Sequence, residues 1–247
     1  MPDRKEQLDK EKQLVAQAAM AFVKSGMKIG LGSGTTSHYF VRLLGEKVRA
    51  GELKVEAVAS SRETAALAQM AGITLMEPQR RLRLDLAVDG ADEIAPDLSL
   101  IKGGGGAHLR EKVVVAAAAY FLVIADSSKL VQRLGAFPVP LEVIPFAAPW
   151  VMDQVEALGG MPVLRMERES VTIPCLTDQQ NYILDCRFPE IDHPAQLAAQ
   201  LEKVPGVVEH GLFVGYARAA LIAQGADVML VQPSTEPRPL SDFRELP

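Results

Sequence analysis

The sequence is poor in the residues that hold metal ions or form covalent bridges. Its 247 residues include four histidines and two cysteines, Cys175 and Cys186. Zinc sites need cysteines and histidines grouped at short, regular intervals, and this sequence has no such group. We expect the two cysteines to be buried free thiols, as is usual in a cytosolic protein, rather than a disulfide. No metal site is predicted.

Long apolar runs and an excess of positive charge are also absent. No run of about 18 apolar residues occurs, which argues against a membrane-spanning helix. The first 26 residues alternate in charge and contain no apolar segment like that of a signal peptide. The net charge of −5 gives no support for a nucleic-acid partner. The composition is typical of a soluble globular protein, which we expect to be cytoplasmic.

Strand and helix patterns alternate along the first half of the chain. This alternation predicts an α/β fold with a parallel sheet covered by helices on both faces. Another apolar stretch, at 226–231, is expected to return to this sheet. The expected strands lie at 27–31, 55–59, 73–76, 84–88 and 121–125, and the expected helices at 5–24, 36–48, 62–71 and 110–119.

The pattern changes after Phe137, where a β-α-β-β-α-β order begins. This order is that of the ferredoxin-like split unit. We therefore predict a larger domain of residues 1–136 plus 213–247, and an inserted smaller α+β domain of residues 137–212. The proline-rich tail, 233–247, is expected to be a loosely held surface segment. The smaller domain's strands are expected at 141–144, 162–166, 182–185 and 207–212, and its helices at 149–158 and 194–204.

The strongest local signal lies between residues 84 and 112. Asp89 and Asp92 follow an apolar strand, at the edge where α/β proteins bind ligands. Lys102 and four glycines then precede a helix that contains Glu111. Each residue has an ordinary structural alternative: a turn or cap for the aspartates, an ion pair for Lys102, and the helix dipole for Glu111. Their combination, with Glu93 nearby, favours a functional site.

A second glycine-rich turn connects the first strand to its helix, with the sequence GSGTT at 32–36. A strand-turn-helix connection of this kind can place an anion at the N-terminus of the helix. The turn has neither the dinucleotide-binding spacing nor the lysine of a P-loop. Its hydroxyls suit a phosphate monoester, and the alternative is a tight turn capped by Ser33 or Thr35. Lys129, after the strand at 121–125, would help to surround an anion.

These groups predict proton transfer rather than nucleophilic catalysis. The four histidines lie in dissimilar contexts, so no nucleophile–histidine–acid set is visible. A carboxylate base, a lysine and backbone N–H donors can move a proton on the carbon next to a carbonyl. The sequence therefore predicts isomerase-like chemistry on a small phosphorylated, polyhydroxylated substrate, without a metal.

The same motifs resemble the type A ribose-5-phosphate isomerase family. DGADE at 89–93, KGGG at 102–105 and REK at 110–112 look like the signature of that family, and GSGTT at 32–36 is similar to its phosphate-binding turn. The resemblance covers about residues 8 to 232, in order. Its further matching segments lie at 124–129, 143–145, 177–178, 183–185, 205–208, 211–213 and 225–228.

The resemblance implies an aldose–ketose isomerase that interconverts ribose 5-phosphate and ribulose 5-phosphate through an enediolate. It implies the non-oxidative pentose phosphate pathway, no cofactor, a Rossmann-like domain with an inserted smaller domain, and a homo-oligomer, with a dimer favoured. Glu111 matches the base, and Asp89, Asp92 and Lys102 match sugar-binding and ring-opening groups. Substrate contacts are implied for Ser33, Gly34, Thr35, Thr36, Gly90, Ala91, Gly103, Gly104, Gly105, Lys129 and Lys12.

His108 departs from the family pattern, in which this position is more often small or aliphatic. It lies one helical turn before Glu111, so it either perturbs the base or crowds the glycine loop.

Two other function classes fit the sequence less well. A sugar-phosphate sensor of transcription needs a helix-turn-helix segment and a basic face, which this sequence lacks. An acyl-CoA transferase of similar architecture would use a glutamate as nucleophile and has no need of the Asp89–Asp92 pair.

Overall fold

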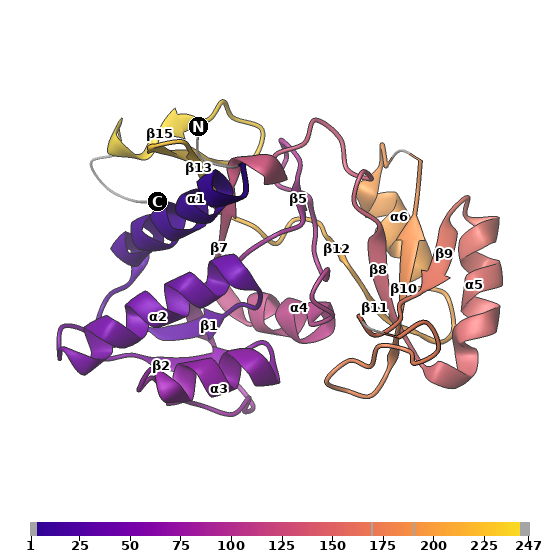
Figure 1. Cartoon of the computed structure of the whole chain (residues 1–247), viewed down its shortest axis with the longest axis horizontal. Coiled ribbons are helices and arrows are strands. Elements are labelled where there is room, and N and C mark those ends of the chain that lie inside the picture. Colours follow the sequence, from indigo (N-terminus) through magenta and orange to yellow (C-terminus); the bar gives the residue numbers. More distant parts are fainter. Residues whose placement is uncertain (1–3, 169, 190, 243–247) are drawn as a thin grey trace.

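Eight strands form the larger sheet, in the order β15-β14-β13-β7-β4-β1-β2-β3 (Figure 1). The computed structural model describes residues 4–168, 170–189 and 191–242. The strands from β13 to β3 are parallel, and β14 and β15 complete one edge in antiparallel fashion. The strands are β1 (Lys28–Leu31), β2 (Glu56–Ala59), β3 (Thr74–Leu75), β4 (Leu84–Asp89), β7 (Ala118–Asp126), β13 (Ala219–Gln224), β14 (Asp227–Val231) and β15 (Arg238–Pro239).

Successive residues of the central strands face opposite sides of this sheet, as the pleat requires. Val88 of β4 packs into the core formed with helices α1, α2 and α3, whereas its neighbour Ala87 belongs to the core of the other face. That second face is covered by α4 and by a small three-stranded sheet. The helices are α1 (Arg4–Ala19), α2 (Thr35–Arg49), α3 (Arg62–Met70) and α4 (His108–Ala116). The predicted α/β architecture is confirmed.

The three-stranded sheet was not predicted from the sequence. It has the order β12-β6-β5, with β5 at Glu93–Ile94, β6 at Leu100–Ile101 and β12 at Leu212–Phe213. Just before β12, the carbonyl oxygen of Gly211 accepts a hydrogen bond from the N–H of Lys102 at 2.8 Å. A Cβ atom at Gly211 would lie 2.2 Å from the carbonyl oxygen of Lys102, so this close approach requires glycine.

A separate four-stranded antiparallel sheet has the order β11-β8-β10-β9. Its elements follow one another as β8 (Val139–Val143), α5 (Ala148–Ala157), β9 (Met161–Leu164), β10 (Tyr182–Arg187), α6 (Pro194–Leu201) and β11 (Val207–His210). This is the predicted ferredoxin-like unit, and Figure 1 shows it beside the larger sheet. The division into domains at residues 137 and 212 remains a prediction.

Local signals explain where several helices begin. The Ser61 hydroxyl caps α3 by accepting a hydrogen bond from the N–H of Thr64 at 3.0 Å. Prolines, which lack the N–H that a first turn leaves unpaired, stand in the first turns of α5 and α6. Within the described ranges, no helix is long and apolar enough to cross a membrane.

The structure corrects three expectations about individual elements. Strand β13 was missed, although it pairs in parallel with β7 and lies inside the larger sheet. The helix expected through residue 119 ends at Ala116, because Ala118 already pairs with Leu84 of β4. The tail contains β15, whose residue Arg238 pairs with Leu230, so this part is not loosely held. Residues 243–247 of the tail lie outside the described residues.

Candidate active site

A cavity of about 150 Å³ opens at the carboxyl ends of β1 and β4. It brings together five segments of the chain: α1, the β1–α2 turn, the residues after β4, the glycine loop with α4, and the short helix that follows β7. Every predicted site residue except Asp89 lines it. The lining consists of Lys12, Ser33, Gly34, Thr35, Thr36, Gly90, Ala91, Asp92, Lys102, Gly103, Gly104, Gly105, Glu111 and Lys129.

Asp89 is 1% exposed and lies outside the lining, and its predicted role as a substrate contact stays a prediction. Its Oδ1 accepts hydrogen bonds from the N–H of Ser33 at 3.0 Å and from the hydroxyl of Ser37 at 2.9 Å. A Cβ atom at Gly32 would lie 2.0 Å from the same oxygen, so the β1–α2 turn can pack on Asp89 only with glycine there. Asp89 therefore shapes the turn. No local sequence pattern indicated this role of Ser37.

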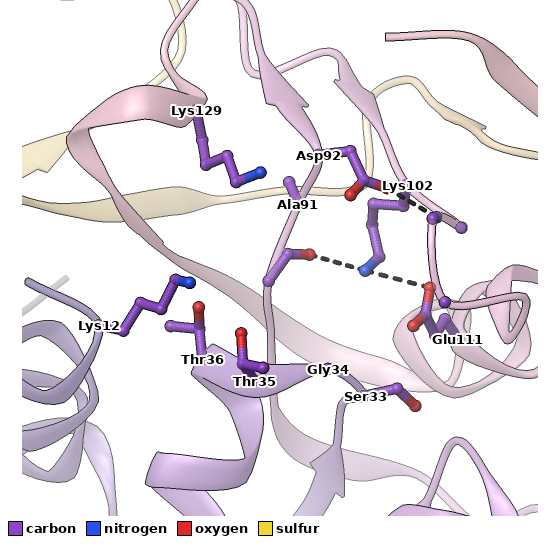
Figure 2. Close-up of a pocket in the computed structure, with 14 residues that line it drawn as sticks. Lys12, Ser33, Gly34, Thr35, Thr36, Ala91, Asp92, Lys102, Glu111 and Lys129 are labelled. Atoms are coloured by element: carbon purple, nitrogen blue, oxygen red, sulfur yellow. Dashed lines mark hydrogen bonds and ion pairs between the residues drawn. The ribbon is translucent and has the colours of Figure 1, made fainter. Parts of the chain in front are cut away.

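Two hydroxyls and two amines gather at one end of the cavity. Figure 2 shows the side chains of Thr35 and Thr36 at the start of α2, with the amine of Lys12 near Thr36 and the amine of Lys129 pointing toward Ala91. Gly34, with φ of +84°, adopts a conformation that favours glycine just before the helix. A helix N-terminus and two cations both favour an anion at this end.

The Ser33 hydroxyl does not join this group. It lies 2.7 Å from the hydroxyl of Ser60, and its side chain points away from Thr36 and Lys12 in Figure 2. Ser33 lines the cavity, but its side chain is engaged with the loop after β2. Because its N–H also donates to Asp89, the substrate contact predicted for Ser33 stays a prediction.

The buried carboxylate of Glu11, which was not predicted from the sequence, links the segment that contains Lys12 to the segment that contains Lys129. Glu11 of α1 accepts hydrogen bonds from the N–H and the hydroxyl of Ser127, at 2.9 and 2.7 Å, and from the N–H of Gly225 at 3.0 Å. Burial opposes its charge, but these hydrogen bonds outweigh burial and lower the pKa of Glu11. Lys12 follows Glu11 directly, and Lys129 ends the short helix Ser127–Lys129. In the sequence, only the position of Glu11 next to Lys12 could have indicated this linking role.

Lys102 is the centre of the opposite end of the cavity. Its amine donates a hydrogen bond to the carbonyl oxygen of Gly90 at 2.7 Å. It also lies 3.0 Å from Asp89 Oδ2 and 3.1 Å from Glu111 Oε2. Burial opposes the positive charge, but Asp89 and Glu111 outweigh it and raise the pKa of Lys102. The amine is therefore held charged and fixed in direction.

Glu111 projects from the first turn of α4 toward Lys102 (Figure 2). Only 5% of the residue is exposed. Burial, which Lys102 counteracts and Asp89 reinforces, raises the pKa of Glu111 to about 7. A carboxylate with such a pKa is a much stronger base than an exposed glutamate and still ionises near neutral pH.

The glycine loop closes over this pair of charges. Asp92 Oδ2 accepts a hydrogen bond from the N–H of Gly104 at 2.8 Å. Gly103 has φ of +104°, and a Cβ atom there would lie 2.7 Å from Nδ1 of His108. Glycine is therefore required at Gly103 by both conformation and space. The loop can bring backbone N–H groups close to a bound molecule.

His108 is fully buried against this loop. Burial, together with the nearby charges of Lys112 and Arg165, lowers the pKa of His108 to about 3. The imidazole is therefore neutral and adds no charge to the site. Of the two effects predicted for His108, the second applies: the side chain fills the space behind the glycine loop. Lys112 points elsewhere, to the carbonyl oxygen of His210 at 2.7 Å.

No metal-binding constellation is present in the part of the chain that the structure describes, where no three His, Cys, Asp or Glu side chains could hold an ion together. Both cysteines, Cys175 and Cys186, are free thiols.

Comparison with known proteins agrees with this arrangement. A family model described as ribose 5-phosphate isomerase A (phosphoriboisomerase A) matches residues 56–227. A protein named ribose-5-phosphate isomerase A from Thermosynechococcus vestitus is 48% identical over 218 residues, which cover 87% of this chain and 92% of that protein.

Two solved structures show the same fold. Ribose 5-phosphate isomerase A from Methanocaldococcus jannaschii superposes with a TM-score of 0.86 at 39% identity, over 91% of this chain and 99% of that one. A D-ribose-5-phosphate isomerase in complex with phospho-erythronic acid superposes with a TM-score of 0.88 at 36% identity, with the same coverage of 91% and 99%. With a matching family model, a fold shared along nearly its whole length and the family's motifs gathered around one cavity, the chain belongs to the ribose 5-phosphate isomerase A family.

Proposed function

We propose that the protein interconverts D-ribose 5-phosphate and D-ribulose 5-phosphate through an enediolate, with Glu111 as the base. The observation that carries the proposal is the buried contact of 3.1 Å between Glu111 Oε2 and Lys102 Nζ at the wall of the cavity. It joins a base whose pKa lies near 7 to a fixed positive charge that can stabilise a developing oxyanion.

The phosphate is bound at the end of the cavity that holds Thr35, Thr36, Lys12 and Lys129. The N-terminus of α2 supplies backbone N–H groups, and the two lysines supply charge. This placement sends the carbon chain of the sugar toward Lys102 and Glu111. Binding of the phosphate then fixes C1 and C2 next to the base.

Ring opening and isomerisation follow at the other end. Asp92, which lines the cavity, accepts the proton of the anomeric hydroxyl and delivers it to the ring oxygen as the ring C–O bond breaks, so that the open-chain aldehyde forms. Glu111 then removes the proton from C2, and the electrons of the C–H bond form the C1–C2 double bond of the enediolate. Lys102 and the glycine-loop N–H groups stabilise the negative oxygen. Glu111 returns its proton to C1, and the hydroxyl proton of O2 passes to O1, so that C2 becomes the ketone and O1 becomes a hydroxyl group.

Asp89 takes part through position rather than contact. It holds the amine of Lys102 at 3.0 Å and shapes the phosphate turn through Ser33 and Ser37. We therefore move Asp89 from the substrate contacts to the supports of the site. We also infer, from the family resemblance, a homodimer in the cytoplasm that acts in the non-oxidative pentose phosphate pathway without a cofactor and without a nucleic-acid or membrane partner.

The test is a direct assay of isomerisation with purified, chelator-treated protein. Conversion of ribose 5-phosphate to ribulose 5-phosphate should proceed after exhaustive dialysis against EDTA, and phospho-erythronic acid should compete with the sugar. Its carboxylate presents a planar, charged group where the enediolate would develop charge. Activity that is lost with EDTA and restored by a divalent ion would reject the carboxylate mechanism. Absence of isomerisation in any condition would reject the function itself.

A further inference from the structure

An arginine outside the cavity lining reaches the glycine loop from the smaller sheet. Arg165 directly follows β9, and its Nη1 donates hydrogen bonds to the carbonyl oxygens of Gly103 and Gly104, both at 3.1 Å. Asp185 of β10 holds the same guanidinium, through Nε at 2.8 Å and through Nη2. Because neither side chain lines the cavity, this pair can affect it only through the loop.

The two carbonyls that Arg165 binds determine where the following N–H groups point. In a trans peptide the C=O and N–H bonds of one plane point in opposite directions. The carbonyl of Gly103 faces Arg165, and the N–H of Gly104 accordingly faces Asp92, to which it donates at 2.8 Å. The carbonyl of Gly104 also faces Arg165, which turns the N–H of Gly105 to the side away from the guanidinium.

Charge adds to this geometric effect. A hydrogen bond from a guanidinium is about twice as strong as a neutral one, and it polarises the peptide that accepts it. A polarised peptide is a better donor at its N–H end. Arg165 thus strengthens the N–H groups of Gly104 and Gly105, which border the cavity next to Asp92.

We propose that Arg165 is a positioning residue for catalysis: it orients and polarises the N–H of Gly104, which holds Asp92, and the N–H of Gly105, which meets a substrate oxygen. The inference rests on the proposed isomerase function. It gives the smaller sheet a part in the chemistry, because both Arg165 and the aspartate that holds it belong to that sheet's segment of the chain.

The competing explanation is that Arg165 only fastens the two sheets together. A second guanidinium–carboxylate pair provides the matched control. Arg110 of α4 lies 3.0 Å from Asp178, in the segment between β9 and β10, and this pair makes no contact with the carbonyls of Gly103 and Gly104. If both arginines only stabilise the packing of the two parts of the chain, loss of either one should have similar effects on kcat and on thermal stability.

The first measurement compares steady-state kinetics and thermal stability of Arg165→Met, Arg165→Lys and Arg110→Met. We expect Arg165→Met to lower kcat at least about tenfold with a smaller change in KM, since charge-assisted hydrogen bonds are lost away from the phosphate end. Arg165→Lys should be intermediate, because an ammonium keeps the charge but its single nitrogen lacks the planar fork through which Arg165 binds both carbonyls and both oxygens of Asp185. Arg110→Met should keep kcat within about twofold of the wild type, even where its Tm falls similarly.

The second measurement is amide hydrogen exchange of Gly104 and Gly106 in the free protein. Their N–H groups are bonded to Asp92 and to the carbonyl of Gly103, so Arg165→Met should speed their exchange while Arg110→Met leaves it unchanged. Wild-type kcat in Arg165→Met, or equal losses of kcat in both methionine variants, would overturn the inference. If the wild type itself fails to isomerise ribose 5-phosphate, the function is rejected, and unchanged exchange would separately reject the role of Arg165 in the loop.

Discussion

The amine of Lys102 lies 3.1 Å from the carboxylate of Glu111 and 3.0 Å from that of Asp89, and both carboxylates are buried. One positive charge is therefore shared between two negative ones. Lys102 and Glu111 line the cavity, and Asp89 contacts Lys102 from outside the lining.

Replacement of Glu111 by glutamine should preserve substrate binding and abolish most of the turnover. The change is nearly isosteric but removes the base, so kcat should fall at least about 10²-fold, as is typical for loss of a general base. Entry of solvent deuterium at C2 of ribose 5-phosphate and at C1 of ribulose 5-phosphate should fall in parallel. Exchange at near the wild-type rate would assign the proton transfer to another group, with Asp92 next to be tested because it lines the cavity.

The pH profile of kcat/KM should report the raised pKa of Glu111. Only the ionised carboxylate accepts a proton, so activity should fall on the acid side with a midpoint near 7 rather than 4.5. The measurement is kcat/KM at pH values between 4.5 and 9, because kcat/KM reports the pKa values of the free enzyme. An acid limb centred near the ordinary value for glutamate would show that the buried environment does not control the base.

The same pKa makes a prediction for stability. Between pH 4.5 and about 7 the folded protein retains a proton on Glu111 that the unfolded chain has lost. The contribution of Glu111 to the free energy of unfolding should therefore decline as the pH rises through about 7. Glu111→Gln, which cannot ionise, should lack this decline. The free energy of unfolding of the variant should therefore rise relative to that of the wild type as the pH increases toward 8. Parallel curves for the two proteins would contradict the prediction.

Thr36→Ala should mainly weaken the binding of the phosphorylated sugar. Loss of one hydrogen bond to a charged group costs about 1.5 kcal/mol, which corresponds to roughly a tenfold rise in KM with a smaller effect on kcat. Steady-state kinetics with ribose 5-phosphate provide the measurement. An unchanged KM in a folded variant would place the phosphate elsewhere in the cavity.

Glu11→Gln should destabilise the protein and raise KM together. The wild-type carboxylate accepts charge-assisted hydrogen bonds from Ser127 and Gly225, so its loss should cost about 2 kcal/mol at pH 7. Because the pKa of Glu11 is lowered in the folded state, this difference should be present above its ordinary value of 4.5 and vanish as the pH falls through the lowered one.

The matched control for this variant is Glu6→Gln on the same helix. Glu6 is exposed and pairs with Lys10 four residues later, so its loss should change the free energy of unfolding little. Both proteins can be compared by urea unfolding at several pH values. Equal effects of the two substitutions, or a KM at the wild-type level in Glu11→Gln, would show that Glu11 does not hold the lysine-bearing segments in place.

The sequence predicted the fold where apolar runs and helical spacing were long, and it predicted the cavity lining where glycines and charged residues stood together. Strand β13 was missed because its stretch, Ala219–Gln224, has few large apolar side chains and lies only two residues before β14. The roles of Asp89 and Arg165 depend on burial and on contacts across long sequence separations. No local sequence pattern indicates which of the two aspartates, Asp89 or Asp92, faces the cavity. Nor does such a pattern indicate which arginine from a distant segment contacts the glycine loop.

Gly211 has a consequence for the order in which the protein is assembled. Every residue that lines the cavity lies between Lys12 and Lys129, yet the backbone of Lys102 is fastened to Gly211, more than a hundred positions later. Strand β13, which flanks β7 in the larger sheet, comes later still. During synthesis, the first half of the chain would contain all the groups of the site, including the partners of the Lys102 amine, but not the backbone partner of Lys102. The backbone of Lys102 therefore gains its hydrogen bond to Gly211 only after the smaller sheet has been made.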